Sequence, residues 1–166
     1  MRITVAPRDG APPFQPEVIA FEMDVDLILR MDRDVVAPAE GTGELVEAMS
    51  EVSAHRLGDV LWLPGDLNEP VCALLLVHDL EQEPSWDESS ISTALSNLLD
   101  EAAARGMTRI ALPMVGTVHG KLQAERFPTL LHAALVRAED APDEIWVMAE
   151  DAAVVSSVRE MLEEAR

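Results

Sequence analysis

An uninterrupted apolar run from Ile110 to Val115 leads directly into a loop that contains Gly116 and Gly120. Because the run is apolar at every position, both of its faces must be buried, which is typical of a strand inside a parallel sheet. Val71 to Val77 is a second such run, with β-branched residues at its ends. These two runs favour a sheet whose faces are both covered by other parts of the chain.

Helical spacings of apolar residues alternate with strands through the second half of the chain. This alternation predicts an α/β fold with a mostly parallel sheet that helices cover on both faces. The predicted elements are a helix that Ser89 or Ser90 caps and Gly106 ends, a helix with Pro128 in its first turn, a strand from Glu144 to Met148, and a last helix that Asp151 caps.

The first half of the chain has shorter apolar runs separated by proline and glycine. We expect strands at Ile3–Ala6, Val18–Met23 and Val60–Leu63, and a further strand at Val25–Leu29. A polar loop from Arg30 to Gly43 then precedes a helix that runs from Glu44 to about Leu57 and stops at Gly58. The sequence has no linker, repeat or low-complexity segment, so residues 1–166 are expected to form one domain.

Composition points to a soluble protein of the cytoplasm. The chain has 166 residues, of which 48 % are hydrophobic, and this is enough for one substantial core. Its longest apolar run is far shorter than the roughly 20 residues that a membrane span needs, and no signal peptide is evident at the start. The single cysteine, Cys72, excludes an internal disulfide and is expected to be a buried, inert thiol.

The charge of the chain is strongly negative. It has 31 acidic and 12 basic residues, a formal net charge of −19, and the acidic residues are spread along the sequence rather than gathered in a tail. Such a surface repels phosphate backbones, which argues against general nucleic-acid binding and against binding to anionic membranes. Any phosphate site in this field must depend on local N–H groups and on a nearby lysine or arginine.

The histidines and the cysteine do not have the close spacing of a zinc site, so neither a metal nor a cofactor is expected. The loop after Val115 has the composition of an anion site, because Gly116 and Gly120 allow positive φ and close approach of N–H groups to a ligand. Ligands of open α/β sheets bind at the carboxyl ends of the strands, where this loop lies. The alternative is a tight connection between strand and helix that binds nothing.

The order of motifs from Leu74 to Leu135 resembles the macro domain family, a group of ADP-ribose-binding α/β modules. The resemblance rests on a strand that ends in His78, on Pro84 and Trp86, on the Asn97-Leu98 pair in the following helix, and on the strand Ile110-Ala-Leu-Pro113 before the glycine loop. It implies a three-layer α/β/α fold with a mixed, mostly parallel central sheet. It also implies ADP-ribose or a related nucleotide as the ligand.

The first half departs from the family pattern. Members of the family usually have an Asn-Ala-Ala-Asn segment after an early strand, but this chain has Arg30 to Asp34 there, without an asparagine. The run of glycines that enters the first helix is reduced to Gly41, Thr42 and Gly43. The chain therefore resembles a divergent member, with weak or absent ADP-ribosyl hydrolase activity.

The resemblance implies a diphosphate held between two loops. One loop supplies Gly41, Thr42 and Gly43; the other supplies Gly116, Thr117, Val118, His119 and Gly120, with Lys121 to offset the acidic field, and Asp24 is the counterpart of the acid that holds the adenine. If the chain hydrolyses ADP-ribose derivatives, Asp32 and His119 are the catalytic candidates, although Asp32 also fits an exposed loop acid. The alternative function is an interaction or oligomerisation module that has lost the ligand. A homo-oligomer is one form that such a module could take.

Overall fold

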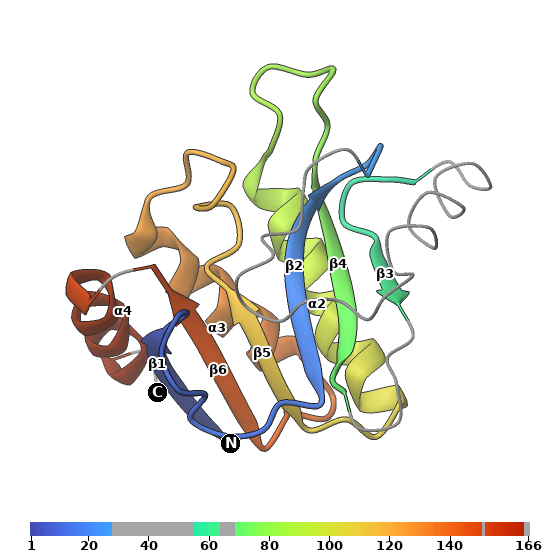
Figure 1. Cartoon of the computed structure of the whole chain (residues 1–166). Coiled ribbons are helices and arrows are strands. Elements are labelled where there is room, and N and C mark those ends of the chain that lie inside the picture. Colours follow the sequence, from blue (N-terminus) through green and yellow to red (C-terminus); the bar gives the residue numbers. More distant parts are fainter. Residues whose placement is uncertain (28–54, 64–68, 151, 165–166) are drawn as a thin grey trace.

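The computed structural model describes residues 1–27, 55–63, 69–150 and 152–164. In these residues, six strands form one sheet in the order β1-β6-β5-β2-β4-β3 (Figure 1). All neighbouring strands are parallel except β3 and β4, which are antiparallel. The strands are β1 (Arg2–Pro7), β2 (Val18–Asp24), β3 (Val60–Leu63), β4 (Val71–His78), β5 (Arg109–Pro113) and β6 (Glu144–Ala149). The predicted α/β class with a mixed, mostly parallel sheet is therefore confirmed.

The two faces of the sheet support two separate hydrophobic clusters. Along β2, Val18 and Ala20 join the cluster that also contains the apolar residues of the helices, whereas Ile19, Phe21 and Met23 join the cluster on the opposite face. This division follows from the two-residue period of a strand, which sends successive side chains to opposite faces. Every residue of β2 is buried, as expected for a strand inside a parallel sheet.

Three helices pack on the same face of the sheet: α2 (Glu88–Ala104), α3 (Phe127–Arg137) and α4 (Ala152–Glu164). Helix α2 lies behind β2 and β4, and α4 lies beside β1 at the far edge (Figure 1). A short 3-10 helix, η1 (Ala124–Arg126), leads into α3. Pro128 occupies the first turn of α3, as predicted, where its missing N–H costs nothing.

The ends of α2 are determined by two residues. The prediction that Ser89 or Ser90 caps this helix is wrong: Asp87 is the cap, and its carboxylate accepts the Ser90 amide at 2.7 Å and the Ser90 hydroxyl at 3.0 Å. A carboxylate is a stronger acceptor for the first-turn N–H groups than a hydroxyl. At the other end Gly106 has a φ of +70°, the left-handed conformation that ends a helix and that glycine adopts at little cost.

Other predicted elements differ in part from the structure. Residues 25–27 form a turn instead of the start of a strand at Val25–Leu29, because the Asp24 carboxylate accepts the Asp26 amide at 2.9 Å and turns the chain. The β5 strand ends at Pro113, two residues before Val115. The predicted helix from Glu44 lies mainly outside the described residues, and its last part, residues 55–58, is not helical. Asp151, the predicted cap of α4, also lies outside them.

None of the helices in the described residues is long and apolar enough to cross a membrane.

Candidate functional site

The carboxyl ends of β2, β4 and β5 meet at one edge of the sheet. β2 pairs with β4 over its whole length, but it pairs with β5 only at Val18↔Ile110 and Ile19↔Ala111. Beyond these pairs, β5 continues into the residue 114–122 loop without pairing to β2. The carboxyl ends of the strands are the side of an α/β sheet at which ligands generally bind.

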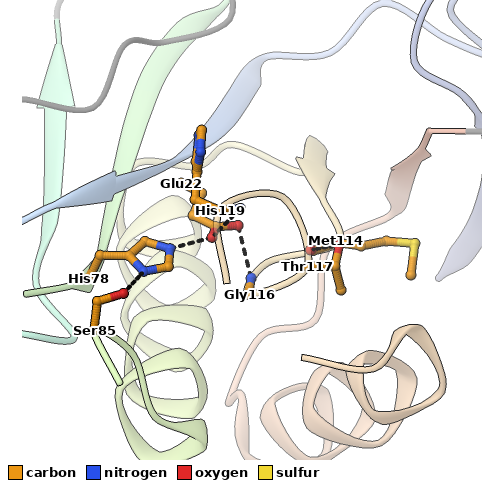
Figure 2. A network of polar contacts seen from close by, with 7 residues as sticks. All are labelled: Glu22, His78, Ser85, Met114, Gly116, Thr117 and His119. Atoms are coloured by element: carbon orange, nitrogen blue, oxygen red, sulfur yellow. Dashed lines mark hydrogen bonds and ion pairs between the residues drawn. The ribbon is translucent and has the colours of Figure 1, made fainter. Parts of the chain in front are cut away.

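A buried carboxylate, Glu22, fills the space between β2 and this loop (Figure 2). Its Oε2 accepts the amide of Gly116 at 2.9 Å, and its Oε1 accepts the amide of His119 at 3.3 Å. The imidazole of His78, at the end of β4, contacts the same Oε1 through Nε2. Three donors, two from the loop and one from β4, therefore converge on one side chain, which is the arrangement that makes a buried carboxylate tolerable.

His78 is held between Glu22 and Ser85 (Figure 2). Because Glu22 accepts two amides, Nε2 of His78 acts as its third donor, and Nδ1 is left to face the Ser85 hydroxyl at 3.3 Å. The side chains of His78 and Glu22 are each 1 % exposed, so water does not compete for these contacts. Both ring nitrogens of His78 are thus engaged within the fold, as expected for a structural residue.

The loop is closed by contacts between its own ends. Gly116 has a φ of +87°, and its carbonyl accepts the Leu122 amide at 3.1 Å. A Cβ added to Gly120 would lie 2.3 Å from that same carbonyl oxygen and 3.1 Å from Trp86. Both glycines are therefore required by the path of the backbone, one for its conformation and the other for close approach.

The remaining predicted loop residues differ in how they are engaged. The Thr117 hydroxyl donates to the Met114 carbonyl at 2.6 Å, so its hydrogen is turned towards the chain (Figure 2). Among the described residues, the amides of Val118 and Gly120 have no acceptor, and Lys121 forms no ion pair. His119 is exposed, and its ring lies at an edge-to-face angle to His78, with 6.2 Å between centroids.

Asp24 lies at the carboxyl end of β2, fully buried, where its Oδ1 accepts the Asp26 amide. The structure thus places Asp24, Gly116, Thr117, Val118, His119, Gly120 and Lys121 at one edge of the sheet. Asp32, Gly41, Thr42 and Gly43 lie outside the described residues, so the second proposed loop is not part of this geometry. In the described part of the chain, no three His, Cys, Asp or Glu side chains could hold a metal ion together.

Glu22 was not among the residues singled out from the sequence. The sequence nevertheless marks this position, because Glu22 is a charged residue in a strand whose other residues before Asp24 are all apolar. A buried acid within such a strand needs several donors, and this requirement directs attention to the loops at its end. The sequence does not show which loop supplies them.

No protein-family model and no curated protein sequence matches the chain. Solved structures do. A macrodomain of Oceanobacillus iheyensis solved with ADP is similar at a TM-score of 0.74 and 15 % identity, over 98 % of this chain and 89 % of that one. A variant of the same protein solved with ADPR gives 0.73 and 16 %, over 98 % and 91 %. A Trypanosoma brucei macrodomain in complex with ADP gives 0.69 and 10 %, over 96 % and 67 %. This chain therefore has the macrodomain fold.

Proposed function

We propose that this chain, with its macrodomain fold, binds ADP-ribose or a related nucleotide diphosphate at the carboxyl ends of β2, β4 and β5. The observation that carries the proposal is the pairing of that fold, solved elsewhere with ADP and ADPR, with a glycine loop at this edge of the sheet. In the loop, the amides of Val118 and Gly120 have no acceptor among the described residues.

The chemistry of the loop suits a phosphate. Backbone N–H groups bind phosphate oxygens without adding side-chain bulk, and the exposed side chain of Lys121 belongs to the same loop. In a chain with a net charge of −19, a local cation is needed to offset repulsion of the ligand. In the proposed complex, Gly41, Thr42 and Gly43 contact the diphosphate from the other side and Asp24 faces the adenine.

Hydrolysis of an ADP-ribosyl bond is the finer part of the proposal. His119 is exposed beside the loop, and its imidazole has no hydrogen-bond partner in the described residues. Imidazole is the side chain that most often serves as a general acid or base in catalysis. In this proposal His119 and Asp32 act as the catalytic pair, with activity that is weak because the Asn-Ala-Ala-Asn segment is missing.

One observation favours a second candidate, an interaction or oligomerisation module that has lost the ligand. Glu22 already occupies the amides of Gly116 and His119, and its carboxylate adds a negative charge beneath the loop. Both effects reduce what the loop offers to an anion. In this second proposal the amide contacts of Glu22 replace those of a ligand.

A thermal-unfolding series separates the two candidates. Wild-type protein is heated with increasing ADP-ribose, ADP or NAD, and with adenosine as a control that has no phosphate. Ligand at 100 times its dissociation constant should stabilise the fold by about 2.7 kcal/mol. For a domain of this size, each kcal/mol raises Tm by roughly 2–4 °C.

The proposed function is wrong if neither ADP-ribose nor ADP raises Tm at millimolar concentration. Concentration-dependent association in sedimentation experiments, without any ligand shift, would support the second candidate. For the hydrolase, an ADP-ribosylated peptide is incubated with the wild type and with His119→Ala. A slower release of ADP-ribose by the variant, at unchanged affinity, is the expected result.

A further inference from the structure

We propose that Glu22 is a positioning residue of the ligand-binding loop. Its carboxylate holds the amides of Gly116 and His119 towards the sheet and thereby leaves those of Val118 and Gly120 for the phosphates of the ligand. This inference rests on the proposed function, because the loop needs positioning for binding only if a ligand binds there.

The loop amides differ in their contacts. Gly116 and His119 donate to the two oxygens of Glu22 and Thr117 donates to the Met114 carbonyl, whereas Val118 and Gly120 have no acceptor among the described residues. Because one rigid carboxylate accepts the amides of both Gly116 and His119, it fixes the orientation of the peptide groups between these two residues. A loop that is fixed before binding pays less ordering entropy when the ligand arrives.

Glu22 is itself held in place. At Glu22 the strand β2 is paired with β4, and His78 from β4 occupies Oε1, with Ser85 behind the ring. Side chains that are 1 % exposed on both sides of the Glu22–His78 contact cannot exchange their partners for water. The loop therefore takes its position from the sheet, through one carboxylate.

Glutamine is the informative replacement at this position. It matches the size of glutamate but offers one acceptor oxygen and one NH₂ group, so either Gly116 or His119 must then face a donor. A buried amide without an acceptor is costly, and the loop should move to avoid it.

Glu17 offers a matched control at the opposite end of the same strands. Just before β2, its Oε2 accepts the amides of Thr108 at 2.8 Å and Arg109 at 3.0 Å, at the amino end of β5. Glu17→Gln therefore disturbs the same kind of contact, between a carboxylate and two amides, without touching the candidate site.

The experiment combines amide hydrogen exchange by NMR with calorimetric titration of ADP-ribose, on wild type, Glu22→Gln and Glu17→Gln. In the wild type, the Gly116 and His119 amides should exchange more slowly than those of Val118 and Gly120, and ADP-ribose should then slow the exchange of the latter two. In Glu22→Gln, exchange at Gly116 or His119 should accelerate and the Kd should rise about tenfold. Glu17→Gln should accelerate exchange at Thr108 and Arg109 and leave the Kd unchanged.

The positioning role is overturned if Glu22→Gln keeps both the wild-type loop exchange and the wild-type Kd, or if Glu17→Gln raises the Kd equally. If Glu22→Gln does not fold, the wild-type exchange pattern decides, and equal exchange at all four loop amides refutes the proposal. Failure of ADP-ribose to bind the wild type refutes the proposed function instead. The effect of Glu22→Gln on loop exchange then still decides whether Glu22 positions the loop.

Discussion

At the scale of single residues, the loop after β5 depends on Gly120. A methyl group on this residue would lie 2.3 Å from the Gly116 carbonyl oxygen, a backbone atom that cannot rotate away. We therefore expect Gly120→Ala to destabilise the protein by about 1–3 kcal/mol and to weaken ADP-ribose binding, because the loop must open to accept the methyl group. Urea unfolding and calorimetric titration measure the two effects. Gly10→Ala is the control, since its added Cβ meets nothing closer than 3.5 Å.

The prediction for Gly120 is wrong if the two variants have equal stability.

The glycines of this loop also show what can be inferred from single residues. The glycines were recognised as positions of special backbone geometry, and Gly116 does adopt a positive φ. The acceptor of its amide was not predicted, because Glu22 is 94 positions away in the sequence. Only the folded sheet brings the two together.

At the scale of elements, Glu17 joins the start of β2 to the start of β5. The amides of Thr108 and then of Arg109, together with the Arg109 guanidinium, lower the pKa of Glu17 below its usual value. A lowered pKa in the folded state adds stability above the unfolded pKa of about 4.3, and this contribution is lost as the pH falls through the folded value. We expect the stability difference between wild type and Glu17→Gln to be constant above about pH 6 and to shrink below about pH 4.5.

Urea unfolding of both proteins between pH 3 and pH 7 tests this expectation, and a pH-independent difference would contradict it.

The element scale is also where the sequence was most informative. Runs such as Val71–Val77 were recognised as strands because burial on both faces demands apolar residues at every position. The turn at residues 25–27 was missed because a local side-chain contact, from Asp24 to the Asp26 amide, ends the strand within an apolar pattern.

At the scale of the whole molecule, the net charge of −19 opposes the compact state. Exposed ion pairs such as Arg105–Glu101 and Arg126–Glu88 offset little of this charge. The chain has 12 basic residues for 31 acidic ones, so most acidic residues cannot have a basic partner of their own. The remaining acidic residues repel one another, and salt screens this repulsion over a Debye length that falls from about 30 Å at 0.01 M to about 10 Å at 0.1 M.

We therefore expect Tm at pH 7 to rise as NaCl increases from about 0.01 M to 0.5 M, by roughly 2–4 °C for each kcal/mol of repulsion removed. The control is the same series near the sequence pI of about 4.3, where carboxylate protonation cancels most of the net charge. If the rise comes from screening, it should be much smaller at that pH, whereas a general effect of salt on apolar burial would persist there. Equal slopes at the two pH values would show that repulsion among the acidic residues does not limit the stability of this fold.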